Sequence, residues 1–126
     1  MAKVGPLRIK LQLACGEEWA FGPGKADLLE AIDRCGSISA AGRAMSMSYR
    51  RAWLLVDTMN RCWAEPLVDA TPGGGDGRGA RLTASGRAML AAYRALEANL
   101  AAASAQDPAF QALAARLLAE PGGAAP

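Results

Sequence analysis

A serine, a tyrosine and two adjacent arginines stand together near the middle of the chain, at Ser48, Tyr49, Arg50 and Arg51. They offer two hydroxyl groups and two guanidinium groups within four residues. Such groups form hydrogen bonds with phosphate oxygens and with the edges of bases in the major groove of DNA. If the segment begins a helix, the positive end of the helix dipole also favours phosphate. The segment is therefore a candidate contact for double-stranded DNA.

Two helices separated by a short break are expected to position this segment. Serines can cap a short helix over residues 40–45, residues 46–48 break it, and a longer helix runs from Tyr49 to about Trp63. Small residues over 40–42 allow the two helices to cross closely. This is the helix-turn-helix pattern, which exposes the start of the second helix. The inward side of the longer helix is predicted to carry Ala52, Leu55, Val56, Met59 and Trp63.

Several of these residues also have a purely structural interpretation. Arg50 and Arg51 could form a solvated helix face, with Tyr49 as a packing residue. Trp53 is expected to belong to the core, because its aromatic bulk stands beside Ala52. The serines before the short helix, Ser37 and Ser39, join the candidate DNA contacts.

A glycine-rich loop over residues 71–79 lies between two predicted strands, at 67–70 and 80–82. It lacks the Gly-Lys-Ser/Thr ending of a phosphate-binding loop, so a nucleotide role is not expected. As the tip of a wing, its glycines and Arg78 would let the backbone approach a sugar-phosphate chain. The alternative is a hairpin end without contacts. Arg81 is either a phosphate contact or simply exposed.

The remaining elements complete an expected fold that is mainly α with small β (α+β). Residues 7–14 alternate as a half-buried strand and pair with 19–21 as a hairpin. A helix follows, with Leu28, Leu29, Ile32 and Cys35 on one face, and ends at Gly36. Thr83 caps a long helix to about Ser104, and Asp107 opens a last one. The expected organisation is an N-terminal strand or hairpin (1–22), a winged helix-turn-helix (23–83), C-terminal helices (84–120) and a loose tail (121–126).

Composition narrows the function classes. The 126 residues are 52% hydrophobic and suffice for one compact domain. The net charge is only +2, but residues 34–94 hold nine arginines and four acidic residues, a net charge of +5. A genome rich in G and C, which encodes arginine freely, is an equally good explanation of that excess.

The residue types argue against catalysis and metal binding. Histidine is absent, and the three cysteines (Cys15, Cys35 and Cys62) have no CxxC spacing. We therefore expect neither a zinc site nor a histidine-dependent active site, and no other enzymatic activity. A cofactor is not expected either. Free cysteines fit a reducing cytoplasm. No apolar run approaches the ~18 residues of a membrane span, so no membrane partner is expected.

Residues 36–96 resemble the N-terminal DNA-binding domain of the ModE-type, molybdate-responsive transcription regulators, a winged-helix family related to the LysR type. The features that match are Gly36-Ser37-Ile38-Ser39-Ala40-Ala41, Met47-Ser48-Tyr49-Arg50-Arg51-Ala52-Trp53, Pro66-Leu67-Val68, the glycine-rich wing, Leu82-Thr83 with Gly86, and Tyr93-Arg94.

This resemblance implies a homodimer that binds a two-fold-related operator, with Ser48, Tyr49, Arg50 and Arg51 on the recognition helix. It also implies that the C-terminal helices (84–120) serve dimerisation, largely through the long helix after the wing, which would form the dimer seam. The seam residues would be Met89, Tyr93, Leu96 and Leu100. From the residues alone, such a stripe is either core or interface.

One departure from the family bears on regulation. The full-length regulators continue into a molybdate-binding module, whereas this chain stops after one more helix, so we do not expect it to sense molybdate alone. It would then repress constitutively, obey another protein, or compete with a full-length regulator. An alternative from another class is a winged-helix protein-interaction module that does not read DNA.

Overall fold

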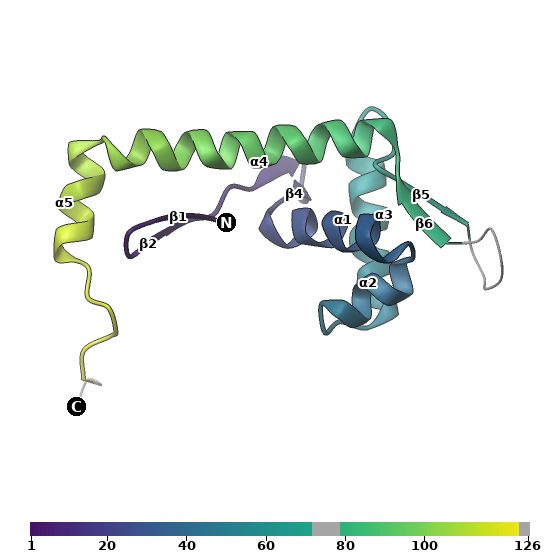
Figure 1. Cartoon of the computed structure of the whole chain (residues 1–126), viewed down its shortest axis with the longest axis horizontal. Helices are drawn as coiled ribbons and strands as arrows, with labels where there is room; N and C mark the ends of the chain where they lie inside the picture. The colour runs from purple at the N-terminus through teal and green to yellow at the C-terminus, as the bar shows by residue number, and fades with distance from the viewer. Residues whose placement is uncertain (72–78, 124–126) are drawn as a thin grey trace. The chain divides into compact units, whose positions relative to one another are not determined.

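The computed structural model describes residues 1–71 and 79–123 (Figure 1). Within them the chain forms five helices and three two-stranded antiparallel sheets, so it mixes helices with small sheets, compatible with the predicted α+β class. Contacts divide the chain into two compact units, residues 12–94 and residues 1–11 with 95–126. The domain boundaries expected from the sequence stay predictions.

Three helices form the centre of the 12–94 unit: α1 (Pro23–Cys35), α2 (Ile38–Ala44) and α3 (Tyr49–Cys62). Proline starts α1, and Gly36 ends it with φ 79°, donating its N–H to the Ile32 carbonyl at 2.8 Å. Among the described residues, the largest fully buried side chains are Phe21, Leu28, Leu29, Ile32, Met59 and Leu67. Cys35, predicted on the same face as the α1 core residues, is exposed in the last turn.

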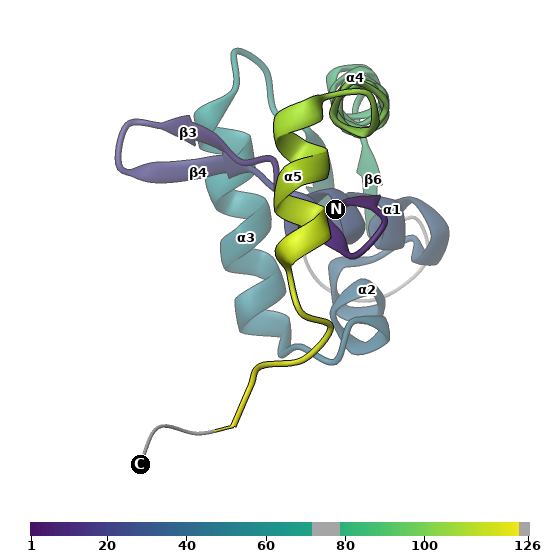
Figure 2. The ribbon, with the colours of Figure 1, turned by 90° about the vertical axis from the view of Figure 1, so that its left-hand side faces the viewer.

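Two hairpins replace the single strand predicted over residues 7–14. In one unit β1 (Ala2–Val4) pairs with β2 (Leu7–Ile9), and in the other β3 (Leu13–Cys15) pairs with β4 (Glu18–Phe21). The prediction of one continuous strand is wrong because each half pairs across its own tight turn, at Gly5 (φ 56°) and Gly16 (φ 58°). Strand β4 lies beside α3 (Figure 2), where Trp63 Nε1 donates to the Ala20 carbonyl at 3.2 Å.

The third hairpin leads into the long helix. Strand β5 (Val68–Thr71) pairs with β6 (Gly79–Leu82), and α4 (Ala84–Ala105) follows. Thr83 caps α4, as predicted: its Oγ1 accepts from the Gly86 N–H at 2.9 Å and donates to the Pro66 carbonyl at 2.6 Å. The start of α4 is thereby fixed to the chain segment before β5.

The last helix, α5 (Pro108–Arg116), begins where the sequence predicts, with the Asp107 carboxylate accepting from the Ala109 N–H at 2.8 Å. In the same unit, the N-terminal ammonium lies 2.8 Å from the Glu97 carboxylate. Among the described residues, no helix is long and apolar enough to cross a membrane. Residues 124–126 of the predicted tail lie outside the described residues.

Candidate nucleic-acid interface

Helices α2 and α3 cross at very close range. Residues 45–48 separate the two helices, so the break begins one residue before the predicted 46–48, and Ser46 turns the chain with φ 56°. A Cβ placed on Gly42 would lie 3.2 Å from the Cβ of Ala52 and 3.3 Å from the Met47 carbonyl oxygen. Ala41 and Ala52 are fully buried at this crossing. Small side chains therefore set the angle at which α3 leaves the turn.

The first turn of α3 faces solvent. Ser48 caps the helix, its Oγ accepting from the Arg51 N–H at 3.1 Å. The side chains of Tyr49, Arg50 and Arg51 are exposed, whereas the opposite side of α3 buries Ala52, Val56 and Met59. Neither arginine forms an ion pair with any described residue. The two guanidinium groups are therefore available to an anionic partner.

The two serines that precede and begin α2 have partners within the chain. Ser37 Oγ caps α2 by accepting from the Ala40 N–H at 3.0 Å. Ser39 Oγ accepts from Arg43 Nη1 at 2.8 Å. Both hydroxyls are half-buried and still have a proton to donate. Their DNA contacts stay predictions.

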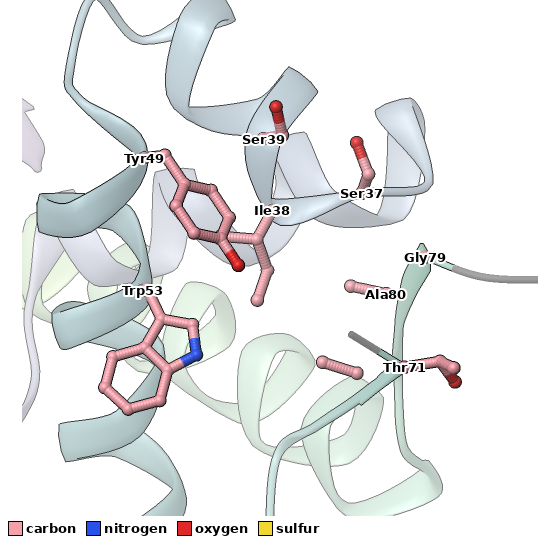
Figure 3. Close-up of a pocket in the computed structure, with 9 residues that line it drawn as sticks. Ser37, Ile38, Ser39, Tyr49, Trp53, Thr71, Gly79 and Ala80 are labelled. Atoms are coloured by element: carbon pink, nitrogen blue, oxygen red, sulfur yellow. The ribbon is translucent and has the colours of Figure 1, made fainter. Parts of the chain in front are cut away.

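A pocket of about 380 Å³ lies between α2, the start of α3 and the β5–β6 hairpin. Figure 3 shows the rings of Tyr49 and Trp53 projecting from the same side of α3 into this space. The prediction that Trp53 belongs to the core is wrong, because its side chain is 45% exposed. Each residue along a helix turns by about 100°, so Trp53 points away from the buried side that Ala52 occupies.

Hydrogen bonds to backbone groups of the hairpin and of the segment just before it hold the hairpin to the helices. Asn60 Oδ1 accepts from the N–H groups of Leu67 (2.9 Å) and Val68 (3.0 Å), and Asn60 Nδ2 donates to the Val68 carbonyl at 3.0 Å. The Ala80 N–H donates to the Gly36 carbonyl at 2.9 Å. Asn60 could not be singled out from the sequence, since a lone polar residue near a helix end has no distinctive spacing.

Arg78 and Arg81 are the two arginines of the hairpin that the sequence offers as DNA contacts. Arg81 lies on β6, exposed, with its Nε 3.8 Å from an Asp69 carboxylate oxygen. Such an exposed pair is weak, so Arg81 can exchange Asp69 for a phosphate at small cost. Arg78 lies outside the described residues.

The stripe predicted as a dimer seam is not uniformly exposed. Tyr93 is 3% exposed and stacks on Phe21, with ring centroids 4.7 Å apart and planes 6° apart. Leu96 is 41% exposed, and Met89 and Leu100 are half-buried. Tyr93 therefore packs in the core of its own chain, and the seam itself stays a prediction.

Ion pairs hold α4 against α1 within the 12–94 unit. Arg94 donates to Asp27 and Glu30, both at 2.7 Å, and Arg87 lies 2.9 Å from Asp33. These two arginines are thus engaged within the chain. Part of the arginine excess noted in the sequence is structural.

Comparison with known proteins finds no family model that matches the chain. It does find similarity to transcription regulators and molybdenum-related proteins. The molybdenum-pterin-binding protein MopB of Rhodobacter capsulatus is 50% identical over 81 residues, 64% of this chain and 30% of the relative. The molybdenum transport protein ModE of Azotobacter vinelandii is 51% identical over 70 residues, 56% of the chain and 26% of the relative.

A third relative has a name that specifies DNA. The DNA-binding transcriptional dual regulator ModE of Escherichia coli K12 is 32% identical over 105 residues, which is 83% of this chain and 38% of the relative. The chain is therefore ModE-like in sequence. It spans only about a third of the length of these curated relatives.

Proposed function

We propose that the chain is a sequence-specific transcription regulator of the ModE type that binds double-stranded DNA through a winged helix-turn-helix. Helices α2 and α3 would form the helix-turn-helix, and β5–β6 the wing. The observation that carries this proposal is the first turn of α3, where Tyr49, Arg50 and Arg51 are exposed beside a Ser48 cap. The similarity to regulators named as DNA-binding supports the same conclusion.

The chemistry of this turn suits a major groove. An α-helix fits the width of the groove, and residues at its N-terminal end reach base edges. Guanidinium groups bind the O6 and N7 atoms of guanine with two hydrogen bonds, and the helix N-terminus favours nearby phosphates. Arg50 and Arg51 would read bases, and Ser48 and Tyr49 would contact phosphate or base edges.

A homodimer on a two-fold-related operator completes the proposal. Two copies would place two α3 helices about one helical turn of DNA apart. The exposed Leu96, with Met89 and Leu100, would contribute to the seam. A full-length regulator is a further candidate partner. The molybdenum-pterin binding named for MopB concerns a protein of which this chain matches 30%, and is not part of the proposal.

Fluorescence anisotropy with a labelled duplex tests the proposal. A duplex of about 30 base pairs would be selected from a random library against the wild-type chain and compared with a scrambled duplex. We expect Arg50→Ala with Arg51→Ala to remove the preference for the selected duplex. Arg81→Ala should weaken binding to both duplexes about equally, as expected for a phosphate contact.

Arg61→Ala is the matched control. Arg61 lies at the other end of α3 and pairs with Asp57 at 3.0 Å, so its removal changes the charge of the same helix away from the interface. It should leave the sequence preference intact. Unchanged preference in the Arg50 and Arg51 variant, or no binding of any duplex by the wild-type chain, would contradict the proposal.

A protein-interaction module is the second candidate, and one observation favours it. Tyr49, Trp53 and Leu54 place three large exposed side chains on α3. Exposed apolar groups of this kind often mark protein contacts. The same anisotropy experiment separates the two functions, because an interaction module would show no duplex binding at physiological salt.

A further inference from the structure

The pocket beside α3 has aromatic and aliphatic walls, although this part of the chain is rich in arginine. Tyr49 and Trp53 stand one helical turn apart and form an aromatic wall, 56% and 45% exposed. Ile38 and Ala80 face them across the pocket (Figure 3). Among the residues that the structure describes, none that lines the pocket carries a charge. The pocket therefore suits a neutral group with apolar faces.

Hydroxyl groups of Ser37, Tyr49 and Thr71 lie at the lining of the same pocket and can donate hydrogen bonds to phosphate oxygens. Arg50 and Arg51 line a different hollow, together with Ser48, Leu54, Leu55 and Thr58. A neutral hollow edged by hydroxyl donors complements a ligand in which a neutral unit stands between two anionic groups. A nucleotide strand has this pattern, with each sugar between two phosphates.

The position of the pocket selects the sugar rather than the base. If α3 enters the major groove, the hairpin beside it meets the adjoining minor groove. One sugar-phosphate strand separates these two grooves. The pocket lies between α3 and the hairpin, so that strand would pass over it.

We propose that the pocket holds one deoxyribose of the DNA backbone, with its C–H groups against the rings of Trp53 and Tyr49. This inference rests on the proposed function and adds a residue, Trp53, that positions the duplex without reading its sequence. The flanking phosphates would accept hydrogen bonds from the hydroxyl groups at the lining. Contacts of this kind fix register on DNA and carry no base information.

The salt dependence of binding separates this apolar contact from an ionic one. Each phosphate neutralised by an arginine contributes about 0.9 to the slope of log K against log salt. Trp53→Ala should weaken binding of the selected and the scrambled duplex alike, by about tenfold, with the slope unchanged. Arg81→Ala, which removes the proposed phosphate contact on β6, should lower the slope. Trp53→Phe, which keeps an aromatic face, should recover most of the affinity.

Trp19→Ala is the matched control, because Trp19 is 50% exposed on β4 and does not line the pocket. It should bind both duplexes like the wild type. Thermal unfolding of both variants, followed by circular dichroism, checks that they fold. A second arm replaces thymine by uracil throughout the selected duplex, which removes every 5-methyl group and leaves the sugars unchanged.

The outcomes are distinct. If the wild-type chain binds DNA and folded Trp53→Ala binds equally well, the sugar contact is wrong while the proposed function stands. If uracil abolishes the effect of Trp53→Ala, the pocket takes a thymine methyl group and the inference is overturned. If a fall in slope accompanies the loss of Trp53, the contact is ionic and the inference is again wrong. Failure of the wild type to bind any duplex removes the proposed function itself.

Discussion

Gly42 and Ala52 meet where α2 crosses α3, so closely that a Cβ on Gly42 would lie 3.2 Å from that of Ala52. A larger side chain must push the helices apart and tilt the first turn of α3. We expect Gly42→Val to lower the free energy of unfolding by about 1–3 kcal/mol. Urea denaturation measures this change. Gly24→Val, at a helical glycine with open space around it, is the control and should cost little. Equal stabilities of the two variants would contradict the close crossing.

Asn60 joins α3 to the β5–β6 hairpin through three hydrogen bonds. Asn60→Ala leaves two part-buried N–H groups and one carbonyl without their partner. We expect it to cost about 2–3 kcal/mol in urea denaturation. Asn60→Asp keeps an acceptor for the Leu67 and Val68 N–H groups but sets an oxygen against the Val68 carbonyl, so its loss should be smaller. An Asn60→Ala variant as stable as the wild type would show that the anchor contributes nothing.

Gly86 touches the Leu67 carbonyl at the start of α4, and a Cβ there would overlap that oxygen. Because the contact is with backbone, relief requires α4 to move. We therefore expect Gly86→Ala to destabilise the chain by about 3 kcal/mol or more, compared with about 1 kcal/mol for Thr83→Val, which loses the cap. Thermal melts of both variants give the ranking. If Thr83→Val destabilised the chain more than Gly86→Ala, the main constraint would be the cap and not the close approach of Gly86 to the Leu67 carbonyl.

Cys62 should react with iodoacetamide more slowly than Cys35. Burial, followed by the neighbouring Cys15 thiol, raises the pKa of Cys62, so less of it is thiolate at about pH 8. Cys35 is exposed at the end of α1. Peptide mass spectrometry over time gives both rates, and Cys15→Ser should speed the labelling of Cys62. Equal rates for Cys62 and Cys35 would contradict the local environment described for Cys62.

Many of the helix boundaries can be predicted from the sequence because the residues that set them act locally. Gly36 stops α1 through a left-handed backbone, and Ser48, Thr83 and Asp107 cap helices with their own side chains. Each of these signals acts on a residue four or fewer positions away. The break between α2 and α3 was predictable for the same reason.

The errors concern contacts between distant residues. Alternation over residues 7–14 predicts a strand but does not say which segments pair with it, and here two different ones do. The size of Trp53 predicts a core position. Because it directly follows the buried Ala52 on the helix, however, its side chain points away from the buried side. The spacing of Tyr93 leaves core and interface both open, and only the contact with Phe21, far away in the sequence, places its ring in the core.

Contact between the first turn of α3 and DNA can be followed residue by residue in the backbone amide and indole N–H spectrum of ¹⁵N-labelled chain titrated with the selected duplex. We expect the largest shifts at residues 48–53 and at the Trp53 indole, with the β3–β4 hairpin and the Trp19 indole unchanged. Shifts centred on the β3–β4 hairpin, with residues 48–53 unmoved, would contradict this contact.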